Sequence, residues 1–287
     1  MEFFRVSRNA WGQETLLGVS WGLLWVFVGA ALVFIAVHLV YKWLLAQDES
    51  RSRASTAASG ELNLPERLIR HQLVDRLYHW TMAVTVLVLL GTSFLPIWGL
   101  KFPWIDAHWI AGVLLTLFVA CHMVRALFWQ DPRSMLIGVR DWRGMVQATQ
   151  WLLRRRKEAP ERPGRYPLLQ KLYHHGIALF ILLILATGIA MMAKIDGPFW
   201  TRNPYLLSSD TWAAIYVVHD LAAMLVLAAL IIHIYFALRP DKLWNTRAMI
   251  FGWIKRSDYV GHYDPELWRA EALDEGTRSN AAVAPGH

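Results

Sequence analysis

Histidine is the residue type in this sequence with the clearest capacity for chemistry. Five of the eleven histidines fall inside or at the edge of long apolar runs: His79, His108, His122, His219 and His233. An ionisable ring is costly to keep in a membrane span, so its presence there indicates a function. Imidazole at these positions would either ligate a metal or relay protons.

The spacing of these histidines favours metal ligation at two levels. His108 and His122 are 14 residues apart, and so are His219 and His233. Fourteen residues make almost four turns of helix, so each pair lies on one face with a rise of about 21 Å, close to the separation of two stacked haems. Two imidazoles from different helices complete the coordination of haem iron, which suits electron transfer and not oxygen chemistry. The orientation of the apolar runs across the membrane, which follows from the distribution of charge, predicts two levels. His108 and His219 lie at the outer level, and His79, His122 and His233 lie at the inner level.

Several alternatives stay open for these residues. Spacing alone allows either His79 or His122 to face His233 at the inner level. Any single histidine could instead be a core residue bonded to a carbonyl of a neighbouring helix, and we interpret His38 in this way because it has no partner at a matching spacing. A haem-free transporter with a histidine proton relay would use the same residues, and it predicts a colourless protein.

Five apolar runs are long enough to position these histidines inside a membrane, whose hydrocarbon core needs about 20 helical residues. Hydrophobic residues make up 55% of the 287 residues and gather into runs, unlike those of a soluble core. The predicted spans cover residues 19–45, 77–97, 108–128, 172–193 and 215–238. Because backbone groups in lipid must be hydrogen-bonded within their own segment, the chain is predicted to be an all-α integral membrane protein.

The distribution of charge predicts the orientation of the spans. Of the 29 Lys and Arg residues, 21 fall in the segments 46–76, 123–171 and 239–256. Positively charged loops stay in the cytoplasm, so the N-terminus is expected outside and the C-terminus inside. The net charge of +7 therefore reflects membrane orientation and not nucleic-acid binding. The single cysteine, Cys121, excludes internal disulfides, a cysteine-held iron–sulfur cluster and covalent haem attachment.

The chain is predicted to have five parts. The first run lacks a small-x-small cleavage site, so it is interpreted as a retained anchor. The segment before the tail alternates apolar and basic residues, as an interfacial helix does. The parts are an N-terminal transmembrane anchor over 1–46, a linker over 47–65, a four-helix domain over 66–240, a cytoplasmic interfacial helix over 241–269 and a disordered tail over 270–287.

Four short motifs surround the histidines. They are Arg76-Leu77-Tyr78-His79-Trp80, His108 with Gly112 four residues later, Val218-His219-Asp220-Leu221-Ala222-Ala223 and Ile232-His233-Ile234-Tyr235-Phe236-Ala237-Leu238. Over residues 66–268 the sequence resembles the gamma subunit of respiratory formate dehydrogenases. The cytochromes b of nickel–iron hydrogenases resemble it in the general arrangement of these motifs.

The resemblance implies a four-helix di-haem cytochrome b bundle, to which the first span is an addition. It implies an outer haem b held by His108 and His219, and an inner haem b held by His79 and His233. It also implies membrane quinone, either menaquinone or ubiquinone, near the inner haem of a bacterial inner-membrane protein. The expected partners are an iron–sulfur subunit that feeds the outer haem and a catalytic subunit that carries the substrate chemistry.

No catalytic residue is predicted in this chain, because the sequence has no nucleophile–base set, Gly-rich phosphate loop or carboxylate pair. The predicted function is that of a membrane cytochrome b subunit that moves electrons between the partner and quinone. A cytochrome b of a hydrogenase or of a sulfur-compound oxidoreductase is the alternative.

The quinone loop of the resembled family is only partly present. Gly164-Arg165-Tyr166 and Gln170-Lys171 match it, whereas Pro167 and Leu169 replace the expected asparagine and glycine. His175, Tyr166 and Gln170 are the candidates for quinone contact. Because imidazole changes charge near neutral pH, we expect His175 to supply the hydrogen bond that the loop has lost.

Overall fold

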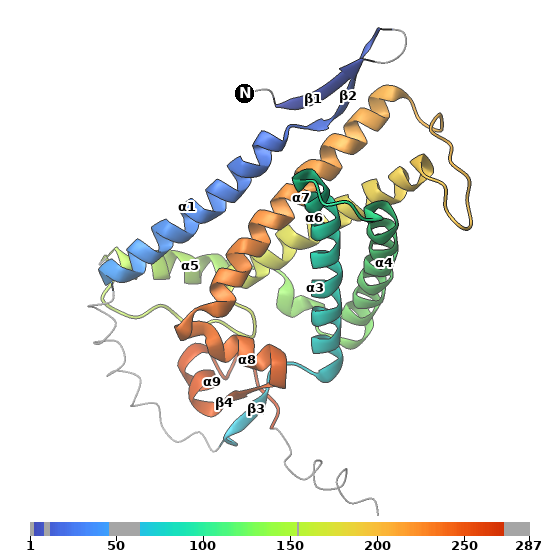
Figure 1. The fold of residues 1–287 in the computed structure, drawn as a ribbon. Coiled ribbons are helices and arrows are strands. Elements are labelled where there is room, and N and C mark those ends of the chain that lie inside the picture. The colour runs from blue at the N-terminus through green and yellow to red at the C-terminus, as the bar shows by residue number, and fades with distance from the viewer. Residues whose placement is uncertain (1–2, 9–11, 46–63, 154, 273–287) are drawn as a thin grey trace, which may run out of the picture. The chain divides into compact units, whose positions relative to one another are not determined.

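The computed structural model describes residues 3–8, 12–45, 64–153 and 155–272. Its described part is mostly helical (Figure 1), and five helices are long and apolar enough to cross a membrane. This finding confirms the predicted all-α membrane architecture with five spans. The five helices are α1 (Trp21–Leu45), α3 (Leu73–Phe94), α4 (Trp104–Trp129), α6 (Leu168–Met191) and α7 (Ser209–Leu238).

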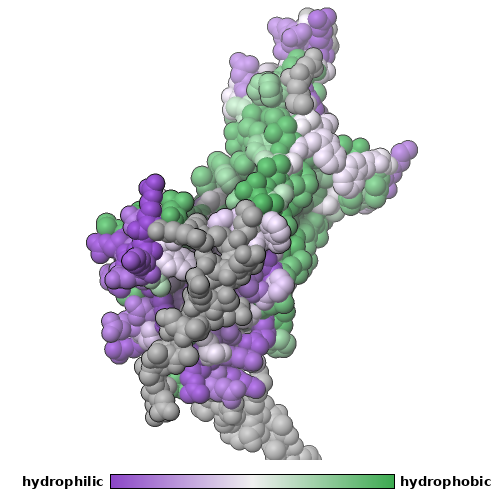
Figure 2. All heavy atoms as spheres, turned by 90° about the vertical axis from the view of Figure 1, so that its left-hand side faces the viewer, coloured by the Kyte–Doolittle hydropathy of each residue, from purple (hydrophilic) through white to green (hydrophobic). Residues whose placement is uncertain are grey.

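The surfaces of these helices are apolar, as lipid requires. On α1, for example, Val37 is 63% exposed and Trp43 is 76% exposed. Hydrophobic residues form a broad area on the face drawn in Figure 2. Large apolar side chains exposed in such numbers mark a surface that meets lipid or another protein and not water.

The chain divides into two compact units. The first unit comprises residues 1–44, 78–130 and 172–236, and it contains most of the five long helices. The second unit comprises residues 45–77, 131–171 and 237–287.

Within the first unit, side-chain contacts show the direction of each helix relative to α7. His79, near the start of α3, lies beside His233, near the end of α7, so these two helices are antiparallel. His108 lies near the start of α4 beside His219, which makes α4 parallel to α7. Helices α3, α4 and α6 meet in an apolar core of Leu89, Ala111, Leu115 and Leu185.

The N-terminal part contains a β-hairpin that the sequence analysis did not predict. Strand β1 (Phe4–Arg8) pairs antiparallel with β2 (Glu14–Val19), directly before α1. The strands are short and the pairing has an irregularity between Arg5 and Val6, so the alternation that reveals a strand is weak. The predicted anchor of residues 1–46 is therefore a hairpin followed by a long apolar helix.

Helix α1 also contacts α7 further along its length. The ring nitrogen Nδ1 of His38 lies 2.7 Å from the hydroxyl of Tyr235, and the two side chains are hydrogen-bonded. The His38 ring also packs edge-on against Phe236. The structure thus provides His38 with the partner that the sequence pattern did not reveal.

The second unit has a small sheet and its own core. Strand β3 (Arg67–Ile69) pairs antiparallel with β4 (Trp253–Lys255), although almost 190 residues separate them in the sequence. Helix α5 (Val139–Leu152) occupies part of the segment that was expected to be a basic loop. The core of the unit consists of Leu68, Ala248, Ile254, Tyr259 and Tyr263.

The single interfacial helix predicted over 241–269 is divided in the structure. It consists of α8 (Leu243–Phe251), strand β4 and α9 (Arg256–His262). Gly252 ends α8 with a φ of +91°, and a Cβ atom at this position would lie 2.9 Å from the carbonyl oxygen of His71. Glycine is the residue that adopts this conformation without strain, so the helix stops here and the chain turns into the strand.

Four short 3₁₀ segments complete the described structure: Leu95–Trp98, Pro132–Met135, Met192–Lys194 and Pro240–Lys242. Most of the predicted linker over 47–65 and of the predicted tail over 270–287 lies outside the described residues.

Candidate functional site

Two pairs of facing histidines lie between the helices of the first unit. His108 on α4 and His219 on α7 have ring centroids 6.3 Å apart. His79 on α3 and His233 on α7 form the second pair, also with ring centroids 6.3 Å apart. Since α7 is continuous from His219 to His233, the pairs are offset by about 21 Å along this helix.

The distance within each pair matches the space that one iron atom needs. A metal–imidazole bond is about 2.0 Å, and the nitrogen lies about 1.1 Å from the ring centroid. Two imidazoles on opposite sides of one iron would therefore have centroids about 6.2 Å apart, if nitrogen, iron and nitrogen were in line. Both pairs have this separation, so both fit an axial pair of haem ligands.

Threonine hydroxyls orient both imidazoles of the His108–His219 pair. The Thr92 hydroxyl donates to the carbonyl of Val88 at 2.8 Å, so its oxygen accepts from Nδ1–H of His108 at 2.8 Å. On α6, the Thr187 hydroxyl donates to the carbonyl of Leu183 and lies 2.8 Å from Nδ1 of His219. These bonds suit the tautomer with the proton on Nδ1, in which Nε2 has a free lone pair to bind a metal.

Gly188 leaves room for the ring of His219. A Cβ atom at Gly188 would lie 3.4 Å from Cε1 of His219, which is tight for a heavy-atom contact. Thr187 and Gly188 thus fix the position of this imidazole from the same turn of α6. The sequence motifs around the four histidines do not include Thr187 or Gly188. A threonine occurs near the end of both α3 and α6, as Thr92 and Thr187, and this recurrence is the sequence signal for their contacts with histidine.

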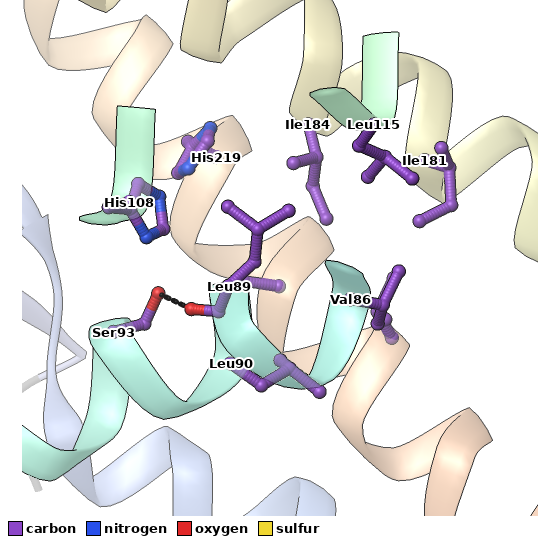
Figure 3. A pocket seen from close by; sticks show the side chains of 11 residues that line it. Val86, Leu89, Leu90, Ser93, His108, Leu115, Ile181, Ile184 and His219 are labelled. Atoms are coloured by element: carbon purple, nitrogen blue, oxygen red, sulfur yellow. Dashed lines mark hydrogen bonds between the residues drawn. The ribbon is translucent and has the colours of Figure 1, made fainter. Parts of the chain in front are cut away.

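An apolar pocket adjoins the His108–His219 pair. The pocket is partly open, and its remaining lining is almost entirely aliphatic. Figure 3 shows the two imidazoles at one end of the pocket, with Leu89, Leu115, Ile181 and Ile184 further along it. An aliphatic pocket that ends in two metal-binding nitrogens suits a large flat apolar ligand with a metal at its centre.

The surroundings of His79 and His233 are aromatic. The ring of Tyr173 on α6 stacks on that of His233 at a centroid distance of 5.4 Å. His122, the second residue that spacing allowed at this level, has its ring 6.0 Å from that of Tyr78. The structure thus brings the ring of His79 to that of His233 and places the ring of His122 beside that of Tyr78.

The predicted quinone-contact residues belong to different units. His175 lies in the first unit, where its ring is perpendicular to that of His174 at 5.8 Å. Tyr166 and Gln170 lie in the second unit. Pro167, one of the departures from the family loop, accepts the backbone N–H of Gln170 at 2.9 Å and so takes part in the start of α6.

Tyr166 lies beside a buried arginine. The guanidinium of Arg70, which is 2% exposed, stacks on the rings of Tyr166, Tyr263 and Trp268 at 4.7–5.2 Å. Burial lowers the pKa of the Arg70 guanidinium and raises the pKa of the Tyr263 hydroxyl. The aromatic face of Tyr166 is thus occupied by Arg70, which favours a packing role for this ring.

Among the described residues, no group of three or more His, Cys, Asp or Glu side chains could hold a metal ion by themselves. The paired histidines need no third protein ligand if the metal comes with a macrocycle, as in haem. Membrane helices with two offset pairs of facing histidines define the class of b-type membrane cytochromes.

Comparison with known proteins agrees with this class. The family model described as prokaryotic cytochrome b561 matches residues 70–252, which is more than half of the chain. The chain belongs to this family, and cytochromes b carry haem b. The resemblance to formate dehydrogenase gamma subunits and hydrogenase cytochromes b is thereby confirmed at the level of the family.

Two relatives align over much of their length. The chain is 22% identical over 232 residues to the cytochrome b556 subunit of formate dehydrogenase from Haemophilus influenzae, which covers 75% of this chain and 88% of the relative. It is 22% identical over 189 residues to a probable Ni/Fe-hydrogenase B-type cytochrome subunit from Bradyrhizobium diazoefficiens, covering 58% of this chain and 76% of the relative. The β1–β2 hairpin and α1 lie outside the matched family region.

Proposed function

We propose that this chain is the cytochrome b subunit of a respiratory oxidoreductase complex, and that it carries electrons between an iron–sulfur partner subunit and membrane quinone. The relative with the larger aligned share is a formate dehydrogenase subunit, which favours a formate dehydrogenase-like complex. The alternative is a hydrogenase complex, which the hydrogenase-type relative supports. In either complex, a separate catalytic subunit carries out the substrate chemistry.

We propose His108 and His219 as the axial ligands of one haem b, and His79 and His233 as those of a second. The observation that carries this proposal is the common centroid distance of 6.3 Å in both pairs. The threonine bonds to His108 and His219 support it, because they leave Nε2 of each ring available.

Haem iron between two imidazoles supplies one-electron transfer without an open coordination site. The task of the protein is to hold the imidazoles at the right separation and to keep their tautomers fixed. Thr92 and Thr187 would do this for one pair, beside which the lining of the pocket is mostly aliphatic.

We further propose that the chain lies in the bacterial inner membrane with its N-terminus outside. The concentration of Lys and Arg in the segments 46–76, 123–171 and 239–256 supports this orientation. The His108–His219 pair then lies toward the outer face, where the iron–sulfur partner would deliver electrons. Quinone reduction at the inner side would take its protons from the cytoplasm.

The content of haem tests the proposed function directly. We expect the purified protein to carry two b haems per chain with low-spin spectra, because each histidine pair fits one bis-histidine iron. A pyridine haemochrome assay with protein quantification measures the ratio. A colourless protein would favour a histidine proton relay, and one haem per chain would contradict the two-level arrangement.

Replacing Thr92 with valine should weaken the retention of haem at the His108–His219 pair. Valine has the same shape but cannot accept the Nδ1–H of His108, so the ring loses its fixed orientation. Loss of such a supporting bond typically costs about 10–100-fold in metal affinity or activity. Haem transfer to apomyoglobin, followed optically, measures the change in retention.

Thr85→Val is the matched control for this variant. Thr85 lies on the same helix and is similarly buried, and its hydroxyl donates to the carbonyl of Thr81. The control should lose haem at the wild-type rate. Equal loss in both variants would mean that the hydroxyl acts on the helix and not on His108.

Replacing His175 with phenylalanine should slow the reoxidation of the reduced haems by quinone. The proposal that His175 donates a hydrogen bond to the quinone carbonyl, and a proton upon reduction, implies slowing by about tenfold or more. Stopped-flow reoxidation by a soluble quinone measures this rate, and the haem spectrum checks that both ligand pairs are intact. The neighbouring variant His174→Phe should retain the wild-type rate. Unchanged reoxidation in His175→Phe would contradict the role of this residue.

A further inference from the structure

The N-terminal hairpin is attached to α7 at the residue that follows His219. A single carboxylate oxygen of Asp220, Oδ2, accepts from Nη2 of Arg5 at 3.0 Å and from the backbone N–H of Val19 at 3.1 Å. Arg5 lies on β1 and Val19 ends β2, so both strands of the hairpin reach this oxygen. Asp220 is therefore the point at which the N-terminal segment meets the haem-ligand helix.

The guanidinium of Arg5 is held in place on several sides. Its Nε donates to the carbonyl of Val19 at 2.8 Å, and its Cζ lies 4.3 Å from the ring centroid of Trp21. The ion pair with Asp220 is half-buried, with side-chain exposures of 35% and 22%. A charge pair fixed in this way keeps its geometry and is less screened than a pair on the open surface.

The hairpin is shaped to bring its backbone close to Asp220. Gly18 has a φ of +139°, and a Cβ atom there would lie 2.3 Å from Oδ2 of Asp220 and 2.8 Å from Nη2 of Arg5. Below this contact, Val19 packs with Leu24 and Met224 in a buried cluster. The hairpin thus contacts α7 through a glycine, an ion pair and an apolar core, none of which includes a proposed haem ligand.

We propose that the hairpin tunes the reduction potential of the haem held by His108 and His219, with Arg5 neutralising Asp220 next to the ligand His219. This inference rests on the proposed haem at this pair. Arg5 and Asp220 are positioning and charge-setting residues and do not bind the haem.

The sign of the effect follows from the charge on the iron. An uncompensated carboxylate stabilises the ferric form, which carries one more positive charge than the ferrous form, and so lowers the potential. An uncompensated guanidinium has the opposite effect. For charges about 10 Å apart in a partly buried site, Coulomb's law gives a change on the order of tenfold in the reduction equilibrium, or about 59 mV for one electron.

A double-mutant cycle that removes the charges of Arg5 and Asp220 tests the proposal on the full haem-loaded protein. In an optical redox titration, Arg5→Gln should lower the potential of one haem component and Asp220→Asn should raise it, each by about tenfold in the equilibrium constant. The double variant should return close to the wild-type value, because neither charge remains. His108→Ala identifies the component, since it should lack that one alone.

The control variant Arg8→Gln removes the other arginine of the same strand, which pairs with Glu14 at 3.6 Å on the exposed side of the hairpin. It should leave both potentials unchanged. Shifts of the same sign in both single variants, or no shift in either, would overturn the proposal. If Arg5→Gln loses the haem, Arg5→Lys should restore both the haem and its potential, and failure to do so would assign Arg5 a purely structural role. If no component is missing in His108→Ala, the haem assignment fails instead.

Discussion

Replacing His108 with alanine is expected to remove one of the two b haems and to leave the other in place. The methyl side chain cannot bind iron, and His219 alone would leave a coordination position open in an aliphatic pocket. The second pair lies four helical turns away along α7, so its iron keeps both imidazoles. The pyridine haemochrome ratio should fall from two to one, and the remaining spectrum should stay low-spin.

His219→Ala should give the same result, because the two rings form one pair. Thr116→Val provides a control on α4, since the Thr116 hydroxyl donates to the carbonyl of Gly112 in its own helix. This control should keep two haems. The independence of the two levels would be refuted if either alanine variant, while still folded, lost both haems.

The second large effect is expected to distinguish His79 from His122 as the ligand of the inner haem. His79→Ala should lose the haem of the inner level, because the rings of His79 and His233 have the separation of an axial pair. His122→Ala should keep two low-spin haems, since the ring of His122 lies against Tyr78. Haem content and the low-spin signals in electron paramagnetic resonance measure both outcomes.

The opposite result would transfer the ligand role to His122. It would also weaken the analogy with formate dehydrogenase subunits, because this resemblance implied His79 as the ligand. Loss of the inner haem in both variants would indicate that His122 supports His79 indirectly, through the contact with Tyr78.

The sequence by itself determined the membrane class, the five spans and the histidine levels. These features are local, because the length of an apolar run and the 3.6-residue period of a helix are contained in consecutive residues. The start of α6 lies within a few residues of the expected position for the same reason. The family-level resemblance also depended on short motifs around His79, His108, His219 and His233.

Only the tertiary structure decided which residues meet across helices. Spacing left His79 and His122 equally placed, because rotation of a helix about its axis is set by its neighbours. The bonds from Thr92 to His108 and from Thr187 to His219 each join two helices, so a one-dimensional pattern cannot reveal them.

The N-terminal hairpin shows the same limit most clearly. Arg5 and Asp220 are 215 residues apart in the sequence, and nothing in the pattern around Arg5 indicates a charged partner on α7. Likewise, β3 pairs with β4 although the residues of the helical region lie between them in the sequence. The local sequence determines the helices and the histidines on them, whereas long-range packing determines which side chains contact those histidines, because such contacts depend on how separate segments fill space together.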